Sequence, residues 1–189
     1  MADQDTRDKE DEGKVKEGTL RRLTDGEIEL AKTVFRSTIP YHNVWIHCDS
    51  YLPFGLQGAH TAMSPNGDIY FRPPLYRKDY SLVVDDLQHL FIHEMSHVWQ
   101  HEQGMNVFAR GIVSGLVSYR YSLDGRRLCE YRMEQQAQII ADRFTLDKYG
   151  YYLWSRLRQG KNPLITCDDN APEIIIRQKY KDCLRGFPW

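Results

Sequence analysis

Apolar residues spaced three or four positions apart predict a helix in the middle of the chain. The series is Val84, Leu87, Phe91, Met95 and Val98, and Gly104 follows it. This spacing places the five side chains on one face of an α-helix, and a glycine just after the last apolar residue is a common stop signal. We therefore expect an amphipathic helix that ends near Gly104.

A helix is also expected before this one. The run Thr24-Asp25-Gly26-Glu27 has the form of a capping box, in which the Thr24 hydroxyl and the Glu27 carboxylate each accept a hydrogen bond from the backbone. Apolar residues at positions 28, 31, 34 and 35 continue the pattern, and the helix should stop before Pro40.

Three helices are expected after the central one. An apolar stripe predicts the first over residues 128–149, with Gly150 near its stop, and a short helix over residues 152–157 follows. Asn170 and Glu173 have the spacing of a second capping box, which predicts a last helix that ends by residue 186.

Strands are expected between the first helix and the central one. Residues 41–48 alternate between apolar and polar positions, which predicts a half-buried strand. Two short β-prone runs, 59–63 and 69–72, flank Pro65-Asn66-Gly67, which is a strong hairpin signal. We therefore predict an α+β fold in which a small antiparallel sheet precedes the central helix and a second long helix follows it.

Two stretches lack these patterns. Residues 1–18 are almost entirely charged or small, so they cannot offset the entropy cost of ordering and are expected to form a disordered charged tail. Residues 109–118 contain two glycines, which favours a loop or a broken helix. Residues 19–189 have the length of a single domain.

Composition excludes several functional classes. The chain has 25 Lys and Arg residues against 26 Asp and Glu residues, so there is no basic field that would favour nucleic acid. No apolar run is long enough to predict a membrane span, and the N-terminus lacks the pattern of a secretion signal. A domain of this size does not depend on disulfides, so we expect free thiols at Cys48, Cys129, Cys167 and Cys183.

The central helix carries the strongest chemical signal, His93-Glu94-Met95-Ser96-His97. On a helix, two histidines four residues apart leave the same face and can bind one metal ion, and zinc suits imidazole ligands. Glu94 projects about 100° around the helix from His93, which places it near a metal-activated water rather than on the metal. The pattern therefore predicts zinc held by His93 and His97, with Glu94 as general base.

A catalytic zinc site usually has a third protein ligand. Gln103 stands where one longer form of the motif has a histidine, so we expect a carboxylate from the helix over residues 128–149. Glu134 is the preferred candidate because it borders the apolar stripe, and Glu130 is the reserve. Asp142 is the third candidate carboxylate of this helix, and it could instead orient His93 or His97 through the other ring nitrogen.

The remaining histidines are not expected to bind the metal. His89 and His101 lie one further turn along the helix on either side, and a rigid helix cannot bring three successive turns onto one ion. We expect these two to be solvated or to support the ligands from behind. His42, His47 and His60 lie among the predicted strands and are expected to be structural or exposed.

The run His93-Glu94-Met95-Ser96-His97-Val98-Trp99-Gln100, followed by residues 134–142, resembles metallopeptidase effectors of bacterial type VI secretion. These include zincin domains fused to the C-termini of VgrG spike proteins and related Rhs- or Vgr-associated proteins. The resemblance covers about residues 82–149. It implies a zincin-like fold, zinc on His93, His97 and Glu134, Glu94 as base, and toxicity towards a competing cell. An immunity protein and a VgrG or Rhs delivery protein are implied partners, and the target-cell periplasm is the implied place of action after synthesis in the producer's cytoplasm.

We expect a zinc-dependent hydrolase that cleaves peptide bonds in a peptide or protein substrate. Glu94 would accept the proton of a zinc-activated water, and Tyr119, Tyr121 and Tyr131 are equally open as donors to the oxyanion. Two alternatives remain at this point. The same metal site would suit a peptidoglycan amidase or endopeptidase, and zinc could also be held by a non-catalytic interaction domain.

Overall fold

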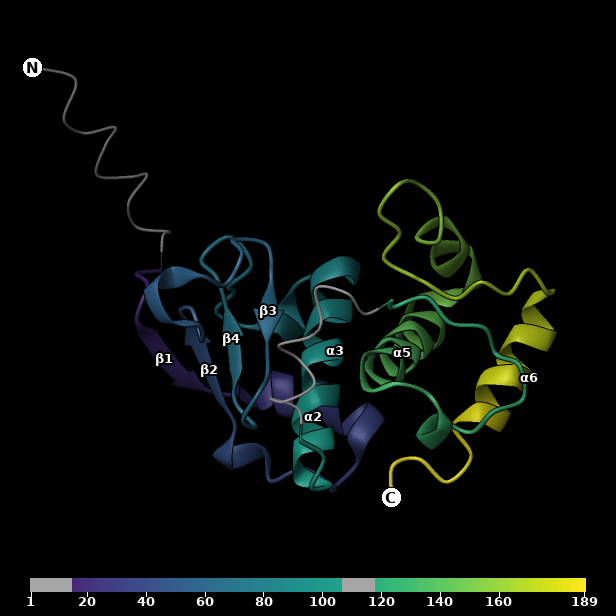
Figure 1. Cartoon of the computed structure of the whole chain (residues 1–189), viewed down its shortest axis with the longest axis horizontal. Coiled ribbons are helices and arrows are strands. Elements are labelled where there is room, and N and C mark those ends of the chain that lie inside the picture. The colour runs from purple at the N-terminus through teal and green to yellow at the C-terminus, as the bar shows by residue number, and fades with distance from the viewer. Residues whose placement is uncertain (1–14, 107–117) are drawn as a thin grey trace, which may run out of the picture.

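The computed structural model describes residues 15–106 and 118–189. A four-stranded sheet, the central helix α3 and the helices α5 and α6 follow one another along the long axis of the molecule (Figure 1). The expected loop or broken helix over residues 109–118 lies almost wholly outside the described residues. Most of the expected tail does so too, although Val15 to Gly18 are described and Gly18 donates a backbone hydrogen bond to Cys48.

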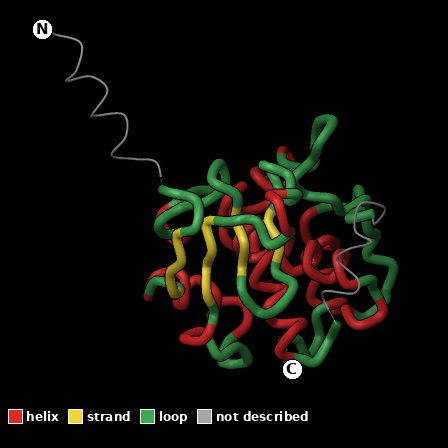
Figure 2. Tube along the Cα trace, turned by 60° about the vertical axis from the view of Figure 1, so that its left-hand side comes forward, coloured by secondary structure: helices red, strands yellow, loops and turns green. Residues whose placement is uncertain are grey.

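The sheet has the strand order β1-β2-β4-β3. Its strands are β1 (Thr19–Arg22), β2 (Trp45–Cys48), β3 (Ala62–Met63) and β4 (Ile69–Phe71). They lie side by side with helices behind one face (Figure 2). β3 and β4 form the predicted antiparallel hairpin, and β1 pairs antiparallel with β2.

The prediction of a purely antiparallel sheet was wrong, because β2 and β4 run parallel. Parallel strands need a long connection, and residues 49–68 supply it by including β3 on the way to β4. The strand predicted over residues 41–48 is also shorter than expected. Its first part is a 3₁₀ turn, Tyr41–Asn43, and only the second part joins the sheet.

The first two helices agree with the sequence. α2 spans Asp25–Phe35 and has both hydrogen bonds of the predicted capping box between Thr24 and Glu27. α3 spans Asp85–Glu102 and buries nearly all of its second half. A stack of aromatic rings ties α3 to the sheet, with centroids 4.6 Å apart between Phe71 and Tyr80 and 5.3 Å apart between Tyr80 and Phe91.

The later helices differ from the prediction at their ends. α5 spans Met133–Arg156, so it begins later than expected, and it contains a kink at Gly150, where the backbone is not helical. Gly150 adopts φ +83° and ψ 170°, a non-helical conformation open to glycine, so the predicted stop near Gly150 and the short helix after it are confirmed. α6 spans Glu173–Cys183, and its predicted capping box is absent because its N-cap is Pro172, which makes no side-chain cap bond.

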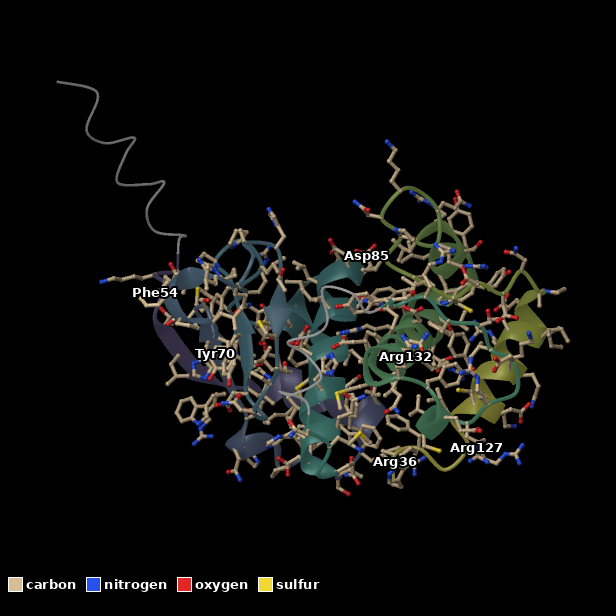
Figure 3. The ribbon with its side chains drawn as sticks, viewed as in Figure 1. Arg36, Phe54, Tyr70, Asp85, Arg127 and Arg132 are labelled. Atoms are coloured by element: carbon tan, nitrogen blue, oxygen red, sulfur yellow. The ribbon has the colours of Figure 1, made fainter. Side chains whose placement is uncertain are left out.

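α3 and α5 lie side by side and run antiparallel. His97 near the end of α3 meets Glu134 at the start of α5, while His89 near the start of α3 meets Asp142 further along α5. Figure 3 shows the consequence, since Asp85 and Arg132, which stand at the starts of the two helices, lie well apart. The pairing aligns the polar faces of both helices over several turns.

Two expectations from composition have structural counterparts. No helix within the described residues is long and apolar enough to cross a membrane. All four cysteines are free, and three of them are buried, whereas Cys129 is exposed.

Candidate metal site

His93 and His97 project from the same face of α3, as their four-residue spacing requires. Their ring centroids are 5.0 Å apart, and the two residues are 7% and 5% exposed. The rings face the first turn of α5, where Glu134 is 9% exposed. Three potential ligands therefore share one nearly enclosed space between the two helices.

The distances among these ligands suit a small tetrahedral ion. Glu134 Oε2 lies 3.5 Å from His93 Nε2 and 3.1 Å from His97 Nε2, and ligand atoms of all three residues lie within 4.8 Å of one another. A tetrahedral ion with bonds of about 2.0 Å keeps its ligand atoms about 3.3 Å apart. The structure thus brings together a possible metal-binding triad of His93, His97 and Glu134.

Charge is concentrated in this triad. Burial acts to lower the pKa of His97, but the charge and hydrogen bond of Glu134 outweigh it and raise the pKa to about 9. Burial likewise acts to raise the pKa of Glu134, yet His97 and His93 hold the pKa of that carboxyl well below its usual range. Glu134 is therefore ionised and available as an anionic ligand.

Gln100 fixes the orientation of the His97 ring. Its amide nitrogen donates to the backbone oxygen of Met133 at 2.9 Å, which leaves its side-chain oxygen 2.8 Å from His97 Nδ1. His97 Nδ1 must then carry the proton and donate, so Nε2 is free to face Glu134. Sequence reasoning missed this role, although the spacing of three residues on one helix is a usable signal.

Glu94 is held by a residue from the sheet. The Ser64 hydroxyl, in the turn between β3 and β4, donates to Glu94 Oε2 at 2.8 Å, and both residues are buried. The turn packs closely on α3, because a Cβ added at Gly67 would lie 2.9 Å from a ring carbon of His101. Sequence reasoning also missed Ser64, since nothing local marks a contact across 30 residues.

The structure separates the three candidate tyrosines. The ring of Tyr119 lies 5.9 Å from that of His93, and burial together with the charges of Glu134 and Glu94 raises its pKa to about 12. Tyr121 instead donates to Asp142, and Tyr131 donates to the backbone of Ser122. Tyr119 alone among the three faces the triad.

The prediction that Asp142 orients one of the motif histidines was wrong. Asp142 Oδ1 lies 2.7 Å from His89 Nε2 instead, because the antiparallel register of α3 and α5 places Asp142 two turns beyond the triad. Glu130, the reserve ligand, is exposed and accepts from the backbone of Arg127. His101 is exposed as well, in agreement with its expected solvation.

The histidines of the sheet region also stay apart from the triad. His47 stacks on Tyr70 with centroids 4.1 Å apart and lies 3.4 Å from a carboxylate oxygen of Asp68. His42 and His60 are exposed. Within the described residues, the triad is the one group of three or more His, Cys, Asp or Glu residues placed to hold an ion.

Comparison with known proteins identifies relatives of this chain. It is 44% identical over 133 residues, 66% of its length, to the type VI secretion system spike protein VgrG2b of Pseudomonas aeruginosa. The chain spans only 13% of that protein's length. No protein-family model matches it.

A solved structure matches more completely. The effector domain of Pseudomonas aeruginosa VgrG2b superposes with a TM-score of 0.61 at 35% identity, covering 86% of this chain and 92% of that domain. The chain belongs to the family of the VgrG2b effector domain. This homology supports a type VI secretion effector related to VgrG proteins. The possible triad therefore lies within an effector domain of the VgrG2b type.

Proposed function

We propose that this effector domain is a zinc metallopeptidase with a zincin-like fold. The observation that carries the proposal is the meeting of His93, His97 and Glu134 at distances suited to a tetrahedral ion, with the buried Glu94 on the same helix. Two imidazoles and a carboxylate form the protein ligand set of known catalytic zinc sites. When bound, zinc would lower the pKa of a water molecule and polarise the carbonyl of the scissile bond.

Glu94 is the proposed general base. The hydrogen bond from Ser64 occupies Oε2 and holds the carboxylate in one orientation. Within this geometry Glu94 accepts the proton of the attacking water and then donates it to the leaving nitrogen. Its burial excludes bulk water, which strengthens its interactions with the reacting groups.

Tyr119 is the proposed donor to the oxyanion. With a pKa of about 12, its phenol keeps its proton at neutral pH. Its position beside His93 lets the hydroxyl donate to a negative charge that develops next to the triad. The residue is 40% exposed, so a substrate can reach it.

The outer edge of β3, which pairs with no further strand within the described residues, supports a peptide as the substrate. β3 is the last strand in the sheet order, and it leads directly to Ser64, which contacts Glu94. An extended peptide that added to this edge would pass next to the proposed base. Main-chain hydrogen bonds would then align the scissile bond without a demand for particular side chains.

Substitution of Glu94 by glutamine tests the proposal. The neutral amide keeps the shape but cannot accept a proton, so hydrolysis of unfolded protein should fall at least about 100-fold while zinc stays near one per chain. Zinc content is measured by metal analysis, and products are identified by mass. Full activity in the variant would contradict the proposal, and so would zinc binding without turnover by the wild type. Cleavage of purified peptidoglycan sacculi alone would favour the amidase or endopeptidase alternative.

The proposed cellular role follows from the family. We propose delivery by a VgrG or Rhs protein, action in the target-cell periplasm and neutralisation by an immunity protein in the producer. The Glu94→Gln variant checks the second point, action in the periplasm, when wild type and variant are expressed in bacteria with and without an export signal. Toxicity should need both export and Glu94, and toxicity of the unexported chain would contradict periplasmic action.

Substitution of Tyr119 by phenylalanine tests the oxyanion donor. Loss of one such donor should lower kcat by about 100-fold or more with little change in KM, because the hydrogen bond strengthens in the transition state. Tyr152, which is 77% exposed on α5, supplies the control, and Tyr152→Phe should leave both constants unchanged. An equal effect of the two variants on kcat would remove Tyr119 from the mechanism.

A further inference from the structure

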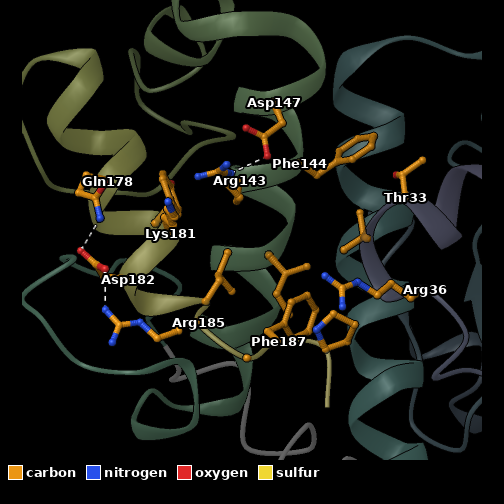
Figure 4. A pocket seen from close by; sticks show the side chains of 16 residues that line it. Thr33, Arg36, Arg143, Phe144, Asp147, Gln178, Lys181, Asp182, Arg185 and Phe187 are labelled. Carbon is orange, nitrogen blue, oxygen red and sulfur yellow. Dashed lines mark hydrogen bonds and ion pairs between the residues drawn. The ribbon is translucent and has the colours of Figure 1, made fainter.

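A cavity of about 670 Å³ lies between α2, α5, α6 and the C-terminal residues 186–188, apart from the triad. Its floor is apolar and includes Val34, Ile140, Phe144, Leu184 and Phe187. Figure 4 shows Phe144 and Phe187 between the α6 side, with Lys181 and Asp182, and the α2 side, with Thr33 and Arg36. None of its lining residues belongs to the triad or contacts Glu94. We call this cavity the α2–α6 groove.

The rim of the α2–α6 groove carries an excess of positive charge. It has four cations, Arg36, Arg143, Lys181 and Arg185, and two carboxylates, Asp147 and Asp182. Both carboxylates are already paired, Asp147 with Arg143 at 2.6 Å and Asp182 with Arg185 at 2.9 Å. Two of the four cations therefore have no carboxylate partner on the rim.

Those two cations are Arg36 and Lys181. Neither side chain makes an ion pair or a hydrogen bond within the described part of the chain, and both residues are exposed. They stand on opposite sides of the groove, Arg36 at the end of α2 and Lys181 on α6 (Figure 4). Each is thus available to an anionic group that arrives from outside.

Arg36 also has an unusual backbone. It is the C-cap of α2 and adopts φ 52° and ψ −122°, a left-handed conformation that favours glycine. Strain of this kind at a residue with a large side chain tends to occur at ligand clamps and other functional positions. The backbone observation is independent of the charge count and points to the same side chain.

The arrangement of charge and apolar surface indicates the chemistry of the occupant. A phosphate group would need cations that converge on one point, whereas Arg36 and Lys181 stand on opposite sides of a groove with an apolar floor. Two separated carboxylates with an apolar side chain between them would complement this pattern. We propose that the α2–α6 groove binds an acidic, apolar segment of a protein partner. Because the groove shares no lining residue with the triad, the partner leaves the proposed metal site open.

A direct binding measurement tests this proposal without reference to hydrolysis. The probe is a fluorescent peptide, Asp-Glu-Leu-Phe-Glu-Asp, titrated with the full chain and followed by anisotropy. The test variant is the double substitution Arg36→Gly and Lys181→Gln, in which glycine keeps the backbone conformation of residue 36 without strain. The matched control is Lys78→Gln with Lys161→Gln, which removes the same charge from two exposed lysines outside the groove.

We expect the peptide to bind the wild type and the control equally, and to bind the test variant at least about tenfold more weakly, with affinity that falls as salt rises. A peptide with lysine in place of each acid should not bind, and one with serine in place of Leu-Phe should bind more weakly than the original. No binding to the wild type at millimolar concentration would overturn the proposal, as would equal affinity for test and control variants. It would also be overturned if only vesicles with anionic phospholipid bound, in a manner dependent on Arg36 and Lys181, because the occupant would then be a membrane surface.

Discussion

Helices α3 and α5 bring a histidine and a carboxylate together at two places along their length, here called the Glu134 level and the Asp142 level. The two levels differ in the number of hydrogen-bond donors that contact the carboxylate. His97 and Glu134 lie 3.1 Å apart at one level, and His89 and Asp142 lie 2.7 Å apart at the other. Both pairs are buried between the same two helices. Their residue types and spacing are nearly equivalent, so the difference in role must come from their surroundings.

At the Asp142 level, both carboxylate oxygens already have two hydrogen-bonding partners each. Oδ1 faces His89 and accepts from Gln138, while Oδ2 accepts from the Tyr121 hydroxyl and from the backbone of Thr166. Full satisfaction of this kind is typical of a structural buried charge.

The Glu134 level is less crowded. Among the described residues, Glu134 Oε2 faces the rings of His93 and His97. The three residues together can present two nitrogens and one oxygen to a common ion. The comparison teaches that the number of donors on a buried carboxylate separates a structural pair from a candidate ligand.

Among the substitutions that test this difference, replacement of Asp142 by alanine should have the largest effect, and the effect should be on stability. It would remove the buried acceptor shared by His89, Tyr121, Gln138 and the backbone of Thr166, at a cost of about 4 kcal/mol in the free energy of unfolding. Urea unfolding monitored by circular dichroism measures this cost.

The control is Asp147→Ala on the same helix, whose carboxylate is 48% exposed and should contribute less than about 1 kcal/mol. Similar losses in the two variants would show that the Asp142 level is not the fully hydrogen-bonded structural pair described above.

Replacement of Glu134 by glutamine should act on the metal rather than on the fold. The amide keeps a hydrogen-bond acceptor near His97 but removes the anionic ligand, so zinc affinity should fall on the order of 100-fold. Competition with a chelator of known affinity measures the change. If Asp142→Ala lost as much zinc affinity as Glu134→Gln while remaining folded, the distinction between the two levels would fail.

Replacement of Gln100 by alanine should have a smaller effect, because it removes a partner of a ligand and not a ligand. Loss of the acceptor on His97 Nδ1 should lower zinc affinity by about tenfold. Gln103→Ala, at the exposed end of the same helix, should leave the affinity unchanged. A Gln100 variant with unaltered affinity would mean that packing alone orients the His97 ring.

Local signals account for the features that the sequence predicted correctly. The capping box of α2 and the antiparallel hairpin depend on residues close together in the chain. The α+β class follows from the same local patterns. The approach of His93 and His97 follows from the geometry of one helix.

Features that depend on register between distant elements could not be predicted in the same way. The partner of Asp142 and the contact of Ser64 with Glu94 both depend on how α3 sits against another element. The parallel pairing of β2 with β4 is non-local for the same reason. The start of α5 was missed because Leu128–Glu130 form a 3₁₀ turn and Tyr131 and Arg132 are extended before the helix begins.

The turn between β3 and β4 approaches α3 at two of its residues, Ser64 and Gly67. A Cβ at Gly67 would lie 2.9 Å from a ring carbon of His101, so a side chain there would require the exposed His101 ring to shift. Three residues earlier, the same turn presents the hydroxyl that grips Glu94. The position of Glu94, the proposed general base, thus depends on a turn whose close approach to α3 requires a residue without a side chain, Gly67.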